Sequence, residues 1–415
     1  MTTASPVVTA DGIPLKQKLA KALFRSRLRA FGLVFPLLAF IVVTFIVPIS
    51  TLMWLSVYDA RYASLMPLST EAMSDWDGVS QPTEAMAEAL VGDFIVARKE
   101  KTIGQVATRV NRELSGTRSL FTKTARSAKN MKAPYMAALI DKDKDWGNIE
   151  TWQAIKVASR TLTPGYLAAA VDMKMQADGS VNLQDEDRRI HITLFFRTLE
   201  ISLLVTIFCL LLGYPVAYLL STLSLRASNL LLILVLLPFW TSLLVRTTAW
   251  IAMLQSQGVM NDLFVLFGIA TDEARFSLIY NKMGTLIAMT HILLPFMILP
   301  LFSVMKTISP SYVRAARSLG ATSQVAFWRV YFPQTIPGIG AGALLVFILA
   351  IGYYITPALV GGQDGQMISN IIDFHMRDSL NWNLAAALGM VLLVFVLLLF
   401  WVYDRIVGID NMALG

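Results

Sequence analysis

Long apolar runs separated by short polar stretches fill the second half of the chain, and one more such run lies near its beginning. The stretches without Asp, Glu, Lys or Arg are 30–58, 201–225, 227–245, 283–305, 330–363 and 379–403. About 20 apolar residues in a helix are enough to cross a bilayer. The pattern therefore predicts six membrane-spanning helices, at 32–56, 198–222, 228–250, 284–304, 339–361 and 383–403.

Residues 59–197, between the first two predicted spans, follow a different pattern. Apolar residues recur at helical spacing among mixed charges in "EALVGDFIVARKEKTIGQVATRVNREL" and in "TWQAIKVASRTL". We expect a mainly helical inserted domain, with strands near 165–193. The first apolar run is too long for a signal-peptide core and no small-residue cleavage site follows it at once, so it is predicted to be a signal anchor.

One stretch of this segment, "DKDKDWGNIETW", superficially resembles a calcium-binding loop because Asp141, Asp143 and Asp145 alternate along it. Such a loop needs a glycine at its sixth position and a glutamate at its twelfth. Here these positions hold Trp146 and Trp152. The sequence favours a solvated charged turn over a calcium site.

Composition places the chain among integral membrane proteins. Of 415 residues, 55% are hydrophobic and only 15% are charged, against about 25% charged in soluble domains. The single cysteine, Cys209, excludes an internal disulfide and a cysteine-based metal cluster. The net charge of +7 could suggest nucleic acid, but the positions of the charges point to membrane topology and not to a nucleic-acid partner.

Basic residues gather on one side of the predicted spans. They are Lys16, Lys18, Lys21, Arg25, Arg27 and Arg29 before the first span, Arg226 between the second and third, and Lys306, Arg314, Arg317 and Arg329 between the fourth and fifth. The loops of the other side hold more acids than bases, namely Asp262, Asp272, Glu273, Asp364, Asp373 and Asp378. The positive-inside rule then predicts cytoplasmic N and C termini.

A compact basic segment, "YVRAARSLGATSQVAFWRVYFPQ" (312–334), lies between the fourth and fifth predicted spans. Ser309 and Pro310 are typical of a helix start, and Gly320 suits a left-handed residue after a helix end. Thr322 can cap a second short helix, which Pro333 is expected to end. Physical reasoning leaves two interpretations equally open: an amphipathic helix resting on lipid headgroups, or a helix that docks on a cytoplasmic partner.

The same segment resembles the signature loop of ABC-importer permeases, which reads Glu-Ala-Ala, three residues, Gly, nine residues, Ile-x-Leu-Pro. Ala315, Ala316 and Gly320 match its small residues, and Pro333 matches its proline. Arg314 stands in the glutamate position, a departure that removes any salt bridge the family makes there. The stretches "LPFWTSLLVRTTAW" (237–250) and "ITPALVGG" (355–362) resemble the polyamine-type branch of these permeases.

The resemblance implies an all-α membrane protein with the six-helix fold of type I ABC importer permeases. Its expected parts are a basic cytoplasmic N-terminus (1–29), helix 1 (30–58), a large periplasmic insertion (59–197), a five-helix core (198–405) with a cytoplasmic coupling loop (306–337), and a cytoplasmic C-terminus (406–415). The resemblance covers helix 1 and the five-helix core. It does not cover the insertion.

The partners and cofactors implied belong to an importer of the bacterial inner membrane. They are a second permease subunit, two ATPase subunits, a periplasmic solute-binding protein, a small-molecule substrate and the lipid bilayer. The chain contains no G-x-x-x-x-G-K-[ST] loop and no HExxH or Cys/His metal spacing. We therefore expect no catalytic residue, metal or cofactor in this chain, with ATP and Mg on the partner ATPase. No acid lies within the charge-free stretches, which argues against a proton-coupled carrier.

Candidate pathway residues are Trp240, Arg246, Trp250, Tyr353 and Tyr354. Arg246 near the outer end of the third predicted span can snorkel or form a structural pair, or it can line the pathway or a gate between subunits. The tryptophans can be interfacial belt residues or can stack on substrate. The tyrosines can be core or pathway residues.

Other residues of the spans are expected to shape the helices. Gly338, Gly340 and Gly342 allow close helix contact, and Pro357 with Gly361 and Gly362 can break the fifth span near its outer end. His291, within the fourth span, is expected to be a hydrogen-bonded packing residue.

The resemblance implies a polyamine such as putrescine or spermidine, or a related amine, as substrate. The alternative is an amino acid derivative or opine-like carboxylated amine, because Arg246 would bind a carboxylate and no buried acid awaits a polycation. A remote alternative from another class is a membrane-anchored sensor or assembly protein that uses the insertion.

Overall fold

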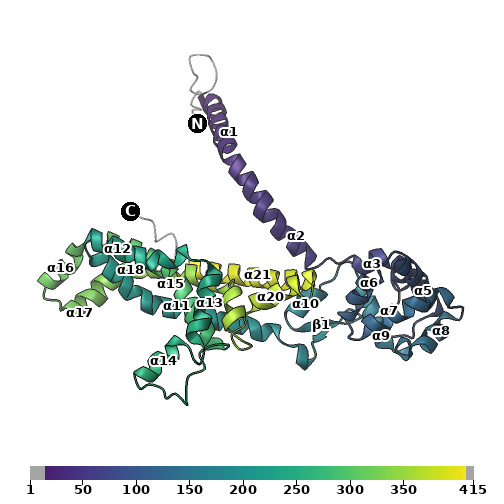
Figure 1. The fold of residues 1–415 in the computed structure, drawn as a ribbon. Helices are drawn as coiled ribbons and strands as arrows, with labels where there is room; N and C mark the ends of the chain where they lie inside the picture. Colours follow the sequence, from purple (N-terminus) through teal and green to yellow (C-terminus); the bar gives the residue numbers. More distant parts are fainter. Residues whose placement is uncertain (1–14, 408–415) are drawn as a thin grey trace. The chain divides into compact units, whose positions relative to one another are not determined.

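The computed structural model describes residues 15–407, and the chain divides into two units, 1–55 and 56–415. The first unit is one helical rod (Figure 1) made of α1 (Leu15–Ile41), a π-helical turn (Val42–Ile46) and α2 (Val47–Leu55). Residues 26–55 of this rod are long and apolar enough to cross a membrane. The first predicted span is therefore a helix.

The inserted segment folds as a mainly helical domain, as the sequence predicts, and its two short strands form a hairpin. Its helices are α3 (Arg61–Leu65), α4 (Pro67–Ala72), α5 (Glu84–Lys99), α6 (Ile103–Asn111), α7 (Thr117–Ser127), α8 (Tyr135–Lys142), α9 (Ile149–Ser159) and α10 (Gly165–Ala170). Strands β1 (Met173–Met175) and β2 (Val181–Leu183) pair antiparallel within the predicted strand region. Its core is built around the rings of Phe94, Phe121, Trp146 and Trp152.

The alternating aspartates form a structural turn in this domain. Asp143 caps a 3-10 turn (Lys144–Gly147) and pairs with Lys123 at 2.9 Å. Trp146, in the place where a calcium loop needs glycine, is fully buried and donates a hydrogen bond to Thr124. The turn therefore positions a core tryptophan.

Three long helices form the centre of the membrane core: α11 (His191–Thr222), α15 (Lys282–Thr307) and α18 (Phe332–Ile351). A Cβ at Gly338 would lie 3.0 Å from Val304 Cβ, and one at Gly342 would lie 2.8 Å from Met297 Sδ. These glycines let α18 approach α15 closely, as predicted.

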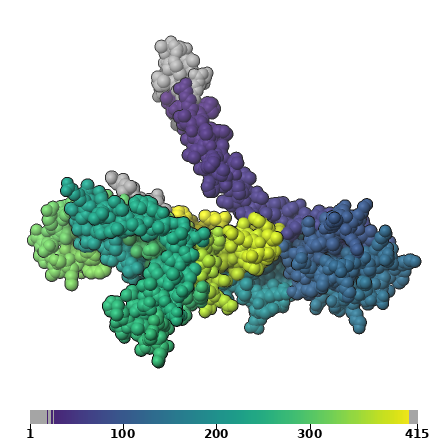
Figure 2. Space-filling view, viewed as in Figure 1, coloured from purple at the N-terminus to yellow at the C-terminus, as the bar shows by residue number. Residues whose placement is uncertain are grey.

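The last predicted span is α21 (Trp382–Val407), whose first turns contact α10 of the inserted domain. Figure 2 shows this contact as the boundary between the blue-teal and yellow surfaces.

The prediction of one straight helix over 228–250 is wrong. The chain forms α12 (Leu225–Leu236) and a 3-10 turn (Leu237–Trp240), then turns by 95° into α13 (Leu243–Leu254) and α14 (Val259–Leu266). Ser242 starts α13 by accepting the backbone N–H of Val245 at 3.2 Å. Arg246 therefore lies in the first turns of a new helix and not near the outer end of a straight one.

The fifth span is broken, as predicted, but at a different place. Helix α18 ends at Ile351, and α19 (Ile355–Val360) begins two residues before Pro357. A proline ring clashes with the carbonyl four residues earlier, which here belongs to Tyr353. Helix α20 (Ile368–Arg377) follows and supplies side chains to the break. Among residues 15–407, five helices are long and apolar enough to span a membrane, or six if the bent pair counts as one span.

Candidate functional site

The basic segment between α15 and α18 begins with a capped helix, α16 (Pro310–Ser318). Ser309 accepts the backbone N–H of Ser311 at 3.3 Å, and Pro310 occupies the first turn. The helix ends at Gly320, whose φ is +91°. Its N–H donates to the Arg317 carbonyl at 3.0 Å, and the next N–H donates to the Ala316 carbonyl at 3.1 Å. This is a Schellman end, so the predicted left-handed role of Gly320 is confirmed.

The tip of this helix is apolar and exposed. Leu319 is 89% exposed, Ala315 is exposed and Ala316 is half-buried. A Cβ at Gly320 would meet nothing within 4 Å in this chain. Arg314 is exposed and makes no ion pair with an acid of the described segment 15–407. Packing within this chain therefore does not explain why small residues stand at this tip.

The prediction that Pro333 ends a second short helix is wrong. Thr322 does cap α17 (Ser323–Ala326), but a π-helical turn (Phe327–Tyr331) then leads directly into α18. The π register accommodates a proline because it already displaces the α-type hydrogen bonds at that point. The side chain of Gln334 also donates to the Val330 carbonyl at 2.6 Å. The segment is thus continuous with the fifth span.

An aromatic cluster ties this segment to α11. Tyr331 is buried and stacks on Phe327, with ring centroids 5.7 Å apart. Both rings also contact Tyr218 edge-on, at 5.4 and 6.0 Å, and Tyr214 lies 6.4 Å from Phe327. We name Tyr214, Tyr218, Phe327 and Tyr331 the aromatic cluster. A displacement of α16 and α17 would be carried to α11 through it.

Three of the five predicted pathway residues lie close together. Trp250 donates from Nε1 to His291 Nδ1 at 3.2 Å, which leaves the His291 proton on Nε2 when the ring is neutral. Arg246 lies one turn before Trp250 on α13, and Tyr353 lies just before α19, which packs against α13. The Nε and Nη1 of Arg246 are buried and have no hydrogen-bond partner among residues 15–407. Buried N–H donors without acceptors are costly, so these two nitrogens are available to donate to an acceptor on a ligand.

His291 is the residue of this group that the sequence did not predict as a site. A histidine inside an apolar span is the available signal, since ionisable residues there are usually functional. His291 also borders a groove of about 470 Å³ between α11, α13 and α15. The groove is lined by Phe208, Leu211, Leu212, Trp250, Met283, Leu286, Ile287, Thr290, His291 and Leu294. The groove is apolar except at its histidine and threonine.

The structure does not bring the other two predicted residues into this group. Trp240 is 75% exposed on the turn before the bend. Tyr354 accepts a hydrogen bond from Arg377 at 3.2 Å. Its carbonyl accepts from Asn370 at 2.7 Å, and the Tyr353 carbonyl accepts from Ser369 at 2.5 Å. Helix α20 therefore satisfies the backbone groups that the helix break leaves free, as a membrane environment requires.

Comparison with known proteins identifies the family. The pattern of the family described as binding-protein-dependent transport system inner membrane component matches residues 201–407. A spermidine/putrescine transport system permease protein PotB of Haemophilus influenzae is 37% identical over 210 residues, 51% of this chain and 73% of that protein. The chain belongs to this family of ABC-importer permeases.

A second PotB protein and one solved structure were also compared with the chain. The permease resembles PotB of Escherichia coli K12, with 32% identity over 57% of this chain and 85% of that protein. A chain of a solved bacterial alginate ABC transporter superposes with a TM-score of 0.43 at 19% identity, over 54% of this chain and 81% of that chain, which is too weak to argue from. The resemblance to the polyamine-type branch is confirmed by the two PotB proteins.

The family match begins at residue 201, so the inserted segment of this permease lies outside it. The matched region contains the segment from Ser309 to Pro333, the aromatic cluster and the group of Arg246, Trp250 and His291. The family match therefore assigns no role to the insertion.

Proposed function

We propose that this permease couples to a separate ATPase subunit through residues 309–333 and carries a polyamine across the inner membrane. Six spans, cytoplasmic termini and a periplasmic insertion complete the proposal, with a second permease and a periplasmic solute-binding protein as partners. The observation that carries the proposal is the tip of α16. It combines a left-handed glycine, small neighbours and the 89% exposed Leu319, and no atom of residues 15–407 lies within 4 Å of a Cβ placed on Gly320.

The mechanism follows from the connections of that tip. Closure of the ATPase pair on ATP would push α16 and α17. The aromatic cluster would pass this displacement to α11, and the π-helical turn would pass it to α18 without a hinge. Helices α11, α15 and α18 pack together, so their rearrangement would open the pathway to one side and then to the other.

The substrate is proposed from the relatives, whose names state spermidine and putrescine. One observation favours a second candidate, a carboxylated amine. The two unpartnered guanidinium nitrogens of Arg246 would pair with a carboxylate, whereas a polycation would be repelled by this charge.

Uptake by the complete complex in proteoliposomes tests both parts. We expect ATP-dependent uptake of labelled putrescine or spermidine, and Arg246→Gln should leave it equal or faster. If a carboxylated amine is the substrate, Arg246→Gln should lower its uptake by at least about tenfold, since a charged hydrogen bond is lost. Uptake that continues with an ATPase-inactive partner would overturn the coupling. The assignment of a polyamine substrate would be overturned if excess polyamine left the uptake and the ATP hydrolysis of the complex unchanged.

A further inference from the structure

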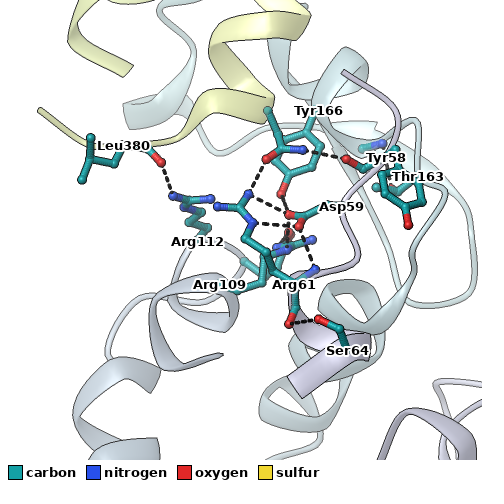
Figure 3. A network of polar contacts seen from close by, with 12 residues as sticks. Tyr58, Asp59, Arg61, Ser64, Arg109, Arg112, Thr163, Tyr166 and Leu380 are labelled. Atoms are coloured by element: carbon teal, nitrogen blue, oxygen red, sulfur yellow. Dashed lines mark hydrogen bonds and ion pairs between the residues drawn. The ribbon is translucent and has the colours of Figure 1, made fainter. Parts of the chain in front are cut away.

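A small cavity is lined mostly by residues before position 201, where the family match begins. It is enclosed by α6, α10, β1 and the turn after β2, and residues Asn381 and Leu384 of the α21 start close it. Figure 3 shows two of its arginines beside the loop at Leu380. Its volume of about 130 Å³ is close to that of a cavity that holds one benzene molecule. The cavity can therefore hold an ion or a small headgroup.

One cation in the wall of the cavity, Arg109, is already neutralised by carboxylates of the same domain. Arg109 is 2% exposed, and its Nη1 bonds Glu113 Oε1 at 2.5 Å. Its Nε lies 3.0 Å from Asp59 Oδ2 in an ion pair that lacks hydrogen-bond geometry. Glu113, the carboxylate that lines the cavity, is thus engaged by Arg109 and is not available to other cations.

Three further cations line the same cavity without a carboxylate partner among residues 15–407: Arg112, Lys174 and Arg188. Arg188 makes one long hydrogen bond, 3.5 Å to Ser115. Arg112 donates to the Leu380 carbonyl at 2.9 Å, while its Nη1 is buried and has no partner. Burial and the nearby Arg61 lower the pKa of Arg112, as expected for a cation that lacks a counter-charge.

Unpartnered acceptors lie in the wall as well. Gln184 Oε1 and Asn381 Oδ1 are buried and have no hydrogen-bond partner in the described part of the chain. Native proteins rarely leave such groups unsatisfied, so an occupant that donates a hydrogen bond to one of them would be stabilised here. An occupant that satisfies this whole wall accepts hydrogen bonds from the cations and donates one to an amide oxygen. An oxyanion that keeps a proton at neutral pH meets both needs, and phosphate does so while sulfate does not.

We propose that this cavity is a binding site for a phosphate-type oxyanion, either free phosphate or a phosphate-bearing lipid headgroup. Arg112, Lys174 and Arg188 supply the charge, and the amide oxygen of Gln184 or of Asn381 accepts a hydrogen bond from the protonated phosphate oxygen. The site joins the insertion to the start of α21, so its occupant would hold these two parts together through Arg112 and Asn381.

Titration of the full chain in a neutral detergent, free of phosphate, tests the site with inorganic phosphate as the probe. We expect saturable binding by calorimetry, and a rise in the thermal unfolding midpoint that an equal ionic strength of chloride does not cause. Sulfate should bind at least several-fold more weakly. The absence of saturable phosphate binding, or an equal affinity for sulfate, would overturn the proposal.

The variants separate binding from folding. Arg112→Gln should weaken phosphate binding by at least about tenfold, because one charged hydrogen bond is lost. Since Arg112 also holds the Leu380 loop, Lys174→Gln and Arg188→Gln are needed beside it, and each should weaken binding in a folded chain. Arg126→Gln, which makes the same charge change at an exposed position of α7, is the control. Unchanged affinity in the Lys174 and Arg188 variants would contradict the proposed site.

Nanodiscs identify the source of the oxyanion. Free phosphate is the natural ligand if the titration is the same in phosphatidylcholine discs with and without phosphatidic acid. A lipid headgroup is the ligand if phosphatidic acid abolishes the phosphate titration that is seen in discs of phosphatidylcholine alone. Phosphate binding in detergent that is absent from both kinds of disc would count against the site in a membrane.

Discussion

At Gly320 the backbone, and not the packing of this chain, restricts the residue type. Its φ of +91° lies in the region that residues with a Cβ rarely adopt, yet a Cβ there would meet no atom within 4 Å. Asparagine tolerates this conformation better than other non-glycine residues. A Gly320→Asn variant therefore adds bulk at the tip while it keeps the Schellman end.

Gly320→Asn should fold and insert normally but lose coupling. We expect ATP hydrolysis stimulated by the binding protein, and substrate uptake, to fall by about tenfold or more. Gly179→Asn is the matched control, because Gly179 has φ +94° and open space on the hairpin of the insertion. Arg314→Glu, which restores the family's acid, should reduce neither activity. Full coupled hydrolysis in Gly320→Asn would contradict docking at this tip.

Asp59 is the centre of a buried ionic network (Figure 3). It accepts hydrogen bonds from Arg61 at 2.8 Å and from Tyr166 at 2.5 Å, and it pairs with Arg109 at 3.0 Å. Burial alone would raise the pKa of Asp59, but the bonds from Arg61, the charge of Arg109 and the Tyr166 hydroxyl outweigh it and lower the pKa to about 2. The ionised carboxylate therefore stabilises the folded state.

Because the folded pKa of Asp59 is depressed from 3.8, its stabilisation is present above about pH 4 and is lost as the pH falls towards 2. Asp59→Asn should lower the free energy of unfolding by about 3 kcal/mol at pH 7, since removal of one partner leaves Arg109 and Arg61 less compensated. Denaturant unfolding of the purified chain at pH 7 and at the lowest pH it tolerates measures both effects. Asp141→Asn, at an exposed position, should change neither, and an equal loss in both variants would rule out the network as the cause.

At the scale of elements, the core depends on how closely α18 lies against α15. A Cβ at Gly338 would be 3.0 Å from Val304 Cβ and 3.3 Å from the Leu301 Cα, and neither atom can rotate away. Gly389 in α21 is a helical glycine with nothing within 4 Å of its Cβ position. The two glycines therefore separate packing from helix propensity.

Gly338→Ala should destabilise the permease by about 1–3 kcal/mol through overpacking. Gly389→Ala should be neutral or stabilise it by up to about 1 kcal/mol, because alanine is the better helix former. Thermal unfolding of the two variants in the same detergent compares them directly. Equal stability in both would mean that α18 and α15 can move apart at no cost.

At the scale of the whole molecule, the insertion is joined to the core of its own unit by polar contacts at the start of α21. Arg61 hydrogen-bonds Asn383, which in turn donates to the Tyr58 carbonyl at 2.8 Å, and Arg112 holds the Leu380 carbonyl. These bonds connect the insertion to the element that follows the helix break and α20. The insertion is therefore placed to affect the last span.

Cysteine accessibility tests which side of the membrane the insertion occupies. The only native thiol, Cys209, is fully buried, so the unaltered chain should stay unlabelled by a membrane-impermeant maleimide. In spheroplasts, Lys129→Cys in the insertion should react and Arg317→Cys in α16 should react only after the membrane is permeabilised. The opposite result would invert the proposed topology.

The sequence by itself determined the membrane class, the approximate place of the helices and the ends of α16. These follow from local physics: runs of apolar residues, a serine cap before a proline, and a glycine that can adopt positive φ. The same local physics indicated the helical insertion and its strands. The family followed from the small residues at Ala315, Ala316 and Gly320.

Only the tertiary structure decided where the helices break and which residues meet. Nothing in the sequence shows that a π-helical turn accommodates Pro333, or that Ser369 and Asn370 satisfy the carbonyls freed before Pro357. The contact of Trp250 with His291 joins residues 41 positions apart in the sequence, and that of Asp59 with Arg109 joins residues 50 positions apart. Such pairs depend on how whole helices pack, and the local pattern of each helix is the same whether or not they form.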